Sequence, residues 1–416
     1  MKKPHPDQHR VIVYGINYAP EMIGVGRFTT QLCDYLAGSG ADIDVITTPP
    51  HYPEWKTNAP YSAGRYMREQ IGAVRVYRCP IWLSKKMRGF ARLLAPLSFA
   101  LSSAPVAMWR ILTQRPDIVI VMEPAFFAVP VALLAAKLSG AKTLLHVQDL
   151  EIDAAFAVGH IRGRAVQKLT VWAERHLLRA FDRVVTISEQ MRKRLLEKGV
   201  DQKCLYLVRN WVDLTQIKPI VGRSSFRDEL RLSDQTLVAL YAGSVGAKQG
   251  LNVMLDAAKL LQTNSEIVFV VAGDGPAKAD LLARYGHLQN VRFLPLQPEA
   301  RLSDLLGLAD VHILPQMAGA ADLVLPSKLG GMLASARHIL ATANPDTELY
   351  DFLSGTAVIV PAGDSAGIAR EVLGLATTRP ETPREKLRGL ASAFDATRSL
   401  AAFADIISDL GPKPVR

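Results

Sequence analysis

Cysteine is scarce in this chain, whose 416 residues include only Cys33, Cys79 and Cys204. The three are odd in number, widely spaced and never arranged as Cys-x-x-Cys. This pattern excludes a disulfide framework and a cysteine-based zinc site, and it favours a reducing compartment. Aromatic residues are also few, at 7%, within a hydrophobic share of 49%. Such a composition is typical of folded α/β layers and argues against disorder.

Long apolar runs are missing as well. The nearest to a membrane span, Leu93–Trp109, contains Pro96 and Pro105, so no transmembrane helix is predicted. The apolar stretch Val11–Ile16 is too short for the core of a signal peptide, and no small-residue cleavage site follows it. We therefore predict a cytoplasmic protein in which Val11–Ile16 forms the first strand.

The formal net charge of +10 is unevenly distributed. Residues through Val212 include 29 Lys+Arg against 17 Asp+Glu, whereas the remainder has 20 against 22. A basic first half predicts a surface for phosphates or anionic lipid, with a merely soluble basic surface as the alternative. No nucleic-acid partner is expected, because the sequence has no helix-turn-helix, zinc or aromatic-basic RNA signature.

Short apolar, β-branched runs alternate with longer helical patterns along the chain. Repeats of this kind predict parallel sheets with right-handed crossovers. The series breaks near Asn210–Lys218, so we predict two Rossmann-like, doubly wound α/β domains, residues 1–212 and 213–410, facing a cleft. The predicted strands are Val11–Ile16, Ile43–Thr47, Val74–Tyr77, Ile118–Met122, Thr143–Val147, Val184–Ile187, Val238–Tyr241, Ile267–Val271, Val291–Leu294, Val311–Leu314, Ile339–Ala341 and Ala357–Val360.

Ligands of open parallel sheets bind beyond the carboxyl ends of the strands, so the residues after each strand are the candidates for a site. Gly24 and Gly26 follow the first predicted strand and precede a helix. Two glycines in that place let backbone N–H groups approach an anion closely. A tight turn that needs positive φ is the structural alternative.

Carboxylates follow the predicted strand Thr143–Val147. Asp149 and Glu151 stand at alternate positions, where they can accept a proton or orient a hydroxyl, and we predict both as catalytic residues. A metal site is not expected there. Glu123 follows the preceding strand, with a role in the site or a place in a solvated loop as equal alternatives. His146 lies inside its strand and is expected in the core rather than in catalysis.

The second half has a more specific pattern. A glycine-rich loop, a lysine and a helix start coincide after Val238–Tyr241, which suits a diphosphate because amides, helix dipole and ammonium all favour an anion. A second glycine loop follows the next strand, where Pro276 is expected at a helix start. Further along, Ser327 or a neighbour is expected to cap a helix, with Lys328 beside it. The loop residues are Gly243, Ser244, Gly246, Lys248, Gly273 and Gly275.

At these residues the chain resembles the retaining glycosyltransferases of family four, which have two Rossmann-like domains (the GT-B fold). More narrowly, it resembles the colanic-acid-type exopolysaccharide transferases. The resemblance rests on six stretches that appear in the family's order: Tyr18-Ala-Pro-Glu21 with Gly24-Val-Gly26, Pro50-His-Tyr-Pro-Glu-Trp55, Val147-Gln-Asp-Leu-Glu151, Gly243-Ser-Val-Gly246 with Lys248-Gln-Gly250, Gly273-Asp-Gly-Pro276, and Leu325-Pro-Ser-Lys328.

The resemblance implies a nucleotide-sugar donor, GDP- or UDP-linked, in the second domain and an acceptor in the first, with no other cofactor. It implies that Lys248, which we predict as a catalytic residue together with Asp149 and Glu151, neutralises the donor diphosphate. It also implies that amides around Ser327 cradle the diphosphate and that the loop from Gly24 to Gly26 closes over the sugar. Base recognition is expected from the backbone near Leu296. The expected donor-binding residues are Gly24, Gly26, Gly243, Ser244, Gly246, Lys248, Gly273, Gly275, Leu296, Asp322, Pro326, Ser327 and Lys328.

The chain departs from the family at one point. Many members have two glutamates, separated by seven residues, that contact the ribose and the sugar. The aligned positions here are Leu323 and Gly331, whose side chains cannot accept a hydrogen bond. Asp322 is the candidate to replace the first glutamate.

We therefore predict a metal-independent glycosyltransferase that moves a hexose or deoxyhexose, with retention, to an exopolysaccharide precursor linked to polyprenyl diphosphate. A sugar-nucleotide epimerase and a nucleotide-sugar-binding pseudoenzyme are the alternatives. The first half is expected to lie on the inner membrane surface through a basic and apolar segment. The candidate segments are Lys85–Leu101 and Ile161–Arg183.

Overall fold

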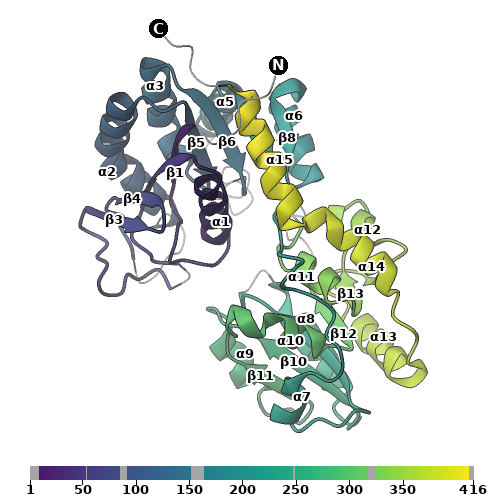
Figure 1. The fold of residues 1–416 in the computed structure, drawn as a ribbon. Helices are drawn as coiled ribbons and strands as arrows, with labels where there is room; N and C mark the ends of the chain where they lie inside the picture. The colour runs from purple at the N-terminus through teal and green to yellow at the C-terminus, as the bar shows by residue number, and fades with distance from the viewer. Residues whose placement is uncertain are drawn as a thin grey trace. The chain divides into compact units, whose positions relative to one another are not determined.

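The computed structural model describes residues 9–52, 54–84, 91–150, 164–246, 249–316 and 325–411. Its contacts divide the chain into two compact units. The first unit comprises Met1–Asn210 and Arg398–Arg416, and the second comprises Trp211–Thr397. Each unit is a sheet covered by helices, as Figure 1 shows. The two Rossmann-like α/β folds predicted from the sequence are confirmed.

The first unit contains an eight-stranded sheet with the order β3-β4-β2-β1-β5-β6-β7-β8. Neighbouring strands are parallel except β3 and β4, which are antiparallel. The strands are β1 (Arg10–Gly15), β2 (Asp42–Thr47), β3 (Met67–Ile71), β4 (Val74–Arg78), β5 (Ile118–Glu123), β6 (Lys142–Val147), β7 (Arg183–Thr186) and β8 (Leu205–Leu207). The helices are α1 (Val25–Gly38), α2 (Ala91–Gln114), α3 (Val129–Ser139), α5 (Arg164–Arg179), α6 (Glu189–Glu197) and α15 (Ala396–Asp409).

The second unit contains a six-stranded sheet with the order β11-β10-β9-β12-β13-β14, in which all neighbours are parallel. The strands are β9 (Leu237–Ala242), β10 (Ile267–Ala272), β11 (Val291–Leu294), β12 (Val311–Leu314), β13 (His338–Thr342) and β14 (Val358–Val360). The helices are α7 (Ser225–Glu229), α8 (Leu251–Leu260), α9 (Lys278–Tyr285), α10 (Leu302–Gly307), α11 (Leu329–Ala334), α12 (Glu348–Leu353), α13 (Ser365–Thr378) and α14 (Arg384–Ala391).

Burial on both faces explains why the strands could be recognised in the sequence. Every residue of β5, β9 and β10 is buried, and such strands appear as continuous apolar runs. All twelve predicted strands are present. The sequence analysis missed β3, an edge strand whose residues alternate between exposed and half-buried, and β8, which has only three residues.

The last helix was expected in the second half, but from Arg398 onward it belongs to the first unit. Its Phe403 is fully buried and meets His146 of β6 edge-to-face, with ring centroids 4.9 Å apart. An amphipathic helix shows its apolar face in the sequence but not the sheet against which that face packs. The predicted boundary at 212/213 therefore misses that the chain returns to the first unit after residue 397.

None of the helices within the described ranges is both long enough and apolar enough to span a membrane. The longest, α2, has 24 residues and includes Pro96 and Pro105.

Truncating Phe403 should destabilise the first unit. Phe403→Ala removes a fully buried ring and leaves a cavity, which typically costs roughly 3–5 kcal/mol. Phe403→Leu should cost less because it fills part of that space. Limited proteolysis with mass-spectrometric mapping of the first cleavage sites measures which unit opens. Earlier cleavage in the second unit alone would contradict the assignment of α15 to the first.

Candidate active site

Two glycine loops meet at the carboxyl edge of the sheet in the second unit. Gly243 follows β9 and Gly273 follows the adjacent β10, and the N–H of Gly243 donates to the carbonyl of Ala272 at 2.9 Å. A Cβ atom on Gly273 would lie 1.9 Å from the Gly243 carbonyl oxygen. The φ of Gly273 is +145°, which residues other than glycine rarely adopt. Only glycine fits at position 273.

The same two loops continue to bond beyond this contact. The N–H of Val245 donates to the carbonyl of Asp274 at 2.8 Å, and the N–H of Ala277 donates to the carbonyl of Val245 at 3.1 Å. Gly275 passes so close that its Cβ would lie 2.4 Å from the Val245 oxygen. The predicted residues Gly243, Gly273 and Gly275 therefore belong to one bonded layer at the end of β9 and β10.

Lys328 lies against this layer. Its Nζ donates a hydrogen bond to the Tyr241 hydroxyl and lies 4.1 Å from the centroid of the Tyr241 ring. A Cβ on Gly243 would be 3.2 Å from the same Nζ. The Tyr241 hydroxyl in turn donates to the carbonyl of Ser244 at 2.5 Å. The structure thus brings together Gly243, Ser244 and Lys328, which the sequence had placed in one site.

Burial lowers the pKa of Lys328 to about 7, because removing the ammonium from water disfavours its charged form. Tyr241, which accepts its hydrogen bond, was not predicted as a site residue. A tyrosine one position before the end of a buried strand resembles any core residue in the sequence, so no signal distinguished it.

The helix starts differ in detail from those predicted. Lys328 rather than Ser327 occupies the cap of α11, and no side chain caps it. Pro326 supplies the first turn through its carbonyl, which accepts from Leu329 N–H at 2.9 Å. The helix expected to start at Pro276 begins at Lys278.

Three remaining positions complete the description of the second unit. Leu296 lies after β11 with 59% of its surface exposed, and Gly246 ends the described part of its loop. At Gly331 a Cβ would lie 3.3 Å from Leu306, so this position faces an apolar side chain. The predicted residues Lys248 and Asp322 lie outside the described residues, as does Leu323.

In the first unit, Glu21 joins the loops after β1 and β2. Its buried carboxylate accepts from the backbone N–H of His51 and, at 2.6 Å, from that of Tyr52. The second oxygen accepts from the Asn17 side chain at 3.0 Å. These contacts connect the Tyr18–Glu21 and Pro50–Trp55 stretches, which are far apart in the sequence.

Arg78, at the end of β4, forms hydrogen bonds with the same two loops. Its fully buried guanidinium donates to the carbonyl of Thr48 at 2.8 Å and to that of Ala19 at 2.5 Å. It also pairs with Glu69 of β3. We call the group Asn17, Glu21, Thr48, His51 and Arg78 the loop clasp. The sequence analysis missed Arg78, because an arginine at the end of a strand looks like an ordinary surface charge in the sequence.

The glycines after β1 have separate structural reasons. A Cβ on Gly26 would lie 2.5 Å from the Glu21 carbonyl oxygen, so the helix start packs directly on the loop. Gly24 precedes α1 with a φ of +56° and open space around its Cα. Gly24 is therefore the member of the pair whose surroundings leave room for a ligand.

The acidic candidates are at the ends of β5 and β6. Asp149 is exposed, and its carboxylate accepts from the backbone N–H of Leu150 at 2.9 Å. Glu123 is buried, while Glu151 lies outside the described residues. His146 is fully buried against Phe403, and burial lowers its pKa to about 3. It lies in the core as expected, although neither ring nitrogen has a hydrogen-bond partner within the described ranges.

Sequence families match both units. A glycosyl transferase 4-like domain matches residues 24–211, and the group 1 glycosyl transferases match residues 236–378. The putative colanic acid biosynthesis glycosyl transferase WcaI of Escherichia coli (strain K12) is 39% identical over 350 residues, 82% of this chain and 84% of that protein. A D-inositol 3-phosphate glycosyltransferase of Streptomyces scabiei is 28% identical over 57% of this chain and 56% of that protein.

Solved structures share the fold at low identity. Sucrose-phosphate synthase from Thermosynechococcus elongatus superposes with a TM-score of 0.72, covering 96% of this chain and 99% of that one, at 14% identity. Anabaena HepE in complex with UDP and glucose gives 0.67 at 14% identity, covering 96% and 100%. These are GT-B glycosyltransferases, and the likeness shows that architecture.

The lowered pKa of Lys328 makes the free energy of unfolding depend on pH, and the direction of this dependence can be predicted. The pKa is about 7 when folded and 10.5 ordinarily, so between these values the unfolded chain holds a proton that the folded chain lacks. The free energy of unfolding therefore rises with pH across this window. Relative to Lys328→Met, the wild type should gain stability from pH 7 to 10 in urea unfolding. A difference that stays constant over that range would show an ordinary, solvated lysine.

Proposed function

The chain belongs to the glycosyltransferases, and from this premise we propose that it transfers a hexose or deoxyhexose from a nucleoside diphosphate to an exopolysaccharide precursor. The observation that supports the donor site most is the bonded layer of Gly243 and Gly273 with Lys328 beneath it. Glycine loops at the carboxyl ends of parallel strands let amides reach phosphate oxygens, and a lysine adds a positive charge.

A diphosphate would change the charge state of Lys328. The buried ammonium loses its proton readily because no anion compensates it. A phosphate beside the Gly243–Gly246 loop would supply that anion, so donor binding favours the charged lysine. HepE binds UDP in its solved complex, and we propose a UDP- or GDP-linked sugar for this chain.

We propose that transfer retains configuration and needs neither metal nor other cofactor. Charge develops on the leaving diphosphate, where Lys328, Lys248 and the loop amides would stabilise it through preorganised electrostatics. Asp149 and Glu151 would orient or deprotonate the acceptor hydroxyl. Asp149 supports this role by its place after β6, exposed at the carboxyl edge where ligands of parallel sheets bind.

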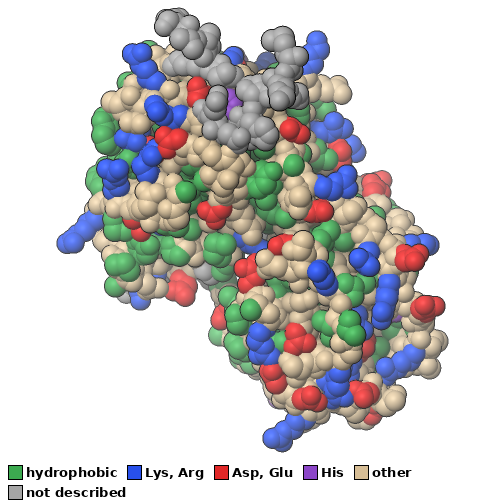
Figure 2. Space-filling model, viewed as in Figure 1, with side chains coloured by type: hydrophobic (Ala, Val, Ile, Leu, Met, Phe, Trp, Pro, Cys, Tyr) green, Lys and Arg blue, Asp and Glu red, His purple; other side chains and the backbone are tan. Residues whose placement is uncertain are grey.

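We propose that the acceptor is linked to polyprenyl diphosphate and that the first unit lies on the inner membrane surface. An exposed apolar stripe on α2 supports this docking. Residues at a spacing of four, Leu97, Leu101, Pro105 and Trp109, are all exposed, with Leu101 at 70%. Figure 2 shows hydrophobic and basic side chains intermixed at the surface over α2 and α3. The segment before α2, residues 85–90, lies outside the described residues.

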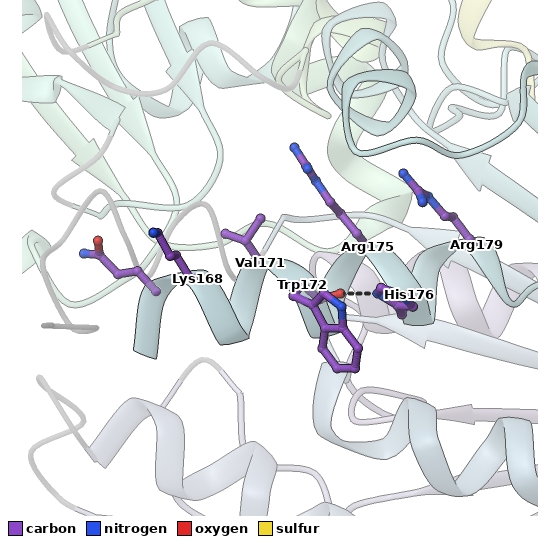
Figure 3. Close-up of a pocket in the computed structure, with 7 residues that line it drawn as sticks. Lys168, Val171, Trp172, Arg175, His176 and Arg179 are labelled. Atoms are coloured by element: carbon purple, nitrogen blue, oxygen red, sulfur yellow. Dashed lines mark hydrogen bonds between the residues drawn. The ribbon is translucent and has the colours of Figure 1, made fainter. Parts of the chain in front are cut away.

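The second predicted segment includes α5, which exposes both cations and apolar side chains. A surface hollow of about 680 Å³ runs along this helix. Figure 3 shows Arg175 and Arg179 extending from one side of α5 and Trp172 from the opposite side. Interfacial helices have such a composition. The described residues that line the hollow are Gln167, Lys168, Val171, Trp172, Arg175, His176 and Arg179.

A thermal-shift screen of UDP and GDP sugars tests the donor site. A donor at one hundred times its Kd stabilises the fold by about 2.7 kcal/mol. Lys248→Ala should weaken binding of the nucleoside diphosphate by roughly 1–3 kcal/mol, as expected for a lost charge-assisted hydrogen bond. Lys259→Ala, at an exposed position of α8, is the matched control. Unchanged affinity in Lys248→Ala would remove that residue from the site, and release of a free epimer without acceptor would contradict transfer.

Flotation with anionic liposomes at low and high salt tests docking. Each surface cation near anionic lipid contributes about 1 kcal/mol, so neutralising Lys85, Lys86, Arg88 and Arg92 together should abolish the salt-sensitive part of binding. Leu101→Asp should weaken the part that persists in salt, because it places a charge on the apolar stripe. Leu282→Asp, at an exposed leucine of α9, should change neither. Failure of the wild-type chain to float with anionic liposomes at either salt concentration would disprove docking.

A further inference from the structure

The loop clasp holds two aromatic side chains that the donor site does not use. Tyr52 and Trp55 lie on the loop after β2 with ring centroids 6.0 Å apart and planes at 86°. Tyr52 has 40% of its surface exposed, and Trp55 is half-buried. Both belong to the Pro50–Trp55 stretch, which carried the family resemblance without an assigned role.

The backbone at Trp55 is strained. Its φ of +55° lies in the left-handed region, which a bulky residue rarely adopts. Such conformations persist when the surroundings enforce them, and they concentrate at ligand-binding sites. The contact of the indole with the buried His51 ring, at 5.6 Å between centroids, is one part of these surroundings.

The clasp explains how a loop without regular structure is held in this conformation. Glu21 binds the N–H groups of His51 and Tyr52, immediately before the strained segment. Arg78 binds the carbonyl of Thr48 on the other side of the turn. The buried carboxylate of Glu21 and the buried guanidinium of Arg78 therefore fix the backbone from which Tyr52 and Trp55 project.

The position of these rings indicates a sugar ligand. They follow β2, whose carboxyl end lies beside those of β1 and β4, at the edge where open parallel sheets bind ligands. The C–H faces of a pyranose ring are apolar and pack on aromatic rings, while a phenol and an indole N–H can bond its hydroxyls. The phosphate-binding type of loop lies in the second unit, so the sugar expected in the first is the acceptor's.

We propose that Tyr52 and Trp55 form a platform for a pyranose ring of the acceptor, and that Glu21 is the positioning residue that orients this platform. The proposal rests on the proposed transferase function for the identity of the sugar as an acceptor. It does not depend on that function for the binding of a pyranose ring itself.

Kinetics of two Trp55 variants test the platform. Glycine adopts a φ of +55° without strain, so Trp55→Gly keeps the backbone while removing the ring. Its KM for the acceptor should rise roughly tenfold, with the KM for the donor unchanged. Trp55→Phe keeps an aromatic face on the same strained backbone and should retain most acceptor affinity. An unchanged acceptor KM in Trp55→Gly, or an equal rise in donor KM, would overturn the proposal.

Glu21→Ala tests the positioning role. The shortened side chain loses its bonds to the two backbone N–H groups and to the Asn17 amide. Acceptor KM should rise as in Trp55→Gly, while donor binding by thermal shift stays as in the wild type. A fall in kcat at unchanged acceptor KM would contradict a role through the platform.

Saturation-transfer NMR separates failure of the platform from failure of the transferase function. Methyl pyranosides of glucose, galactose and mannose are the probes, without nucleotide, and the aromatic protons are saturated. Transfer to at least one pyranoside in the wild type and Trp55→Phe, and its loss in Trp55→Gly, supports the platform whether or not sugar transfer is detected. No transfer to any pyranoside in the wild type would disprove it, even in an active transferase.

Discussion

The backbones of Gly273 and Gly243 approach so closely that no side chain fits between them, and the proposed donor site depends on this contact. It lets the loops after β9 and β10 bond to each other through Val245 and Asp274. The bonded layer then covers Lys328, whose ammonium reaches the Tyr241 hydroxyl rather than water. A single steric constraint thus fixes the amides and places a lysine beside them.

In the first unit, buried charged side chains also bond to the loops and hold them. Arg78 and Glu21 are both buried, and burying such groups is costly unless their hydrogen bonds are made. Here the guanidinium reaches the carbonyls of Thr48 and Ala19, and the carboxylate reaches two N–H groups and an amide. Removing either partner would leave loop groups unpaired, so the cost of the buried charges maintains one loop conformation.

The sequence predicted both sheets because fully buried parallel strands leave continuous apolar runs, as in β5, β9 and β10. It also predicted that Gly243 and Lys328 share a site, since both follow strands of one parallel sheet. It did not predict Tyr241 or Arg78, because a side chain's partners depend on packing between segments distant in the sequence. The return of α15 to the first unit was missed for the same reason.

The departure at Gly331 bears on the charge of Lys328. These residues are three apart at the start of α11, and a glutamate at the later position would be a neighbour able to pair with the ammonium. Glycine there faces Leu306 and supplies no charge, so burial dominates and the pKa of Lys328 falls to about 7. The lysine is then stabilised in its charged form chiefly by an anion that arrives. In the proposed donor site, protonation of Lys328 would be coupled to occupation by phosphate, because burial disfavours the charge that would bind the diphosphate.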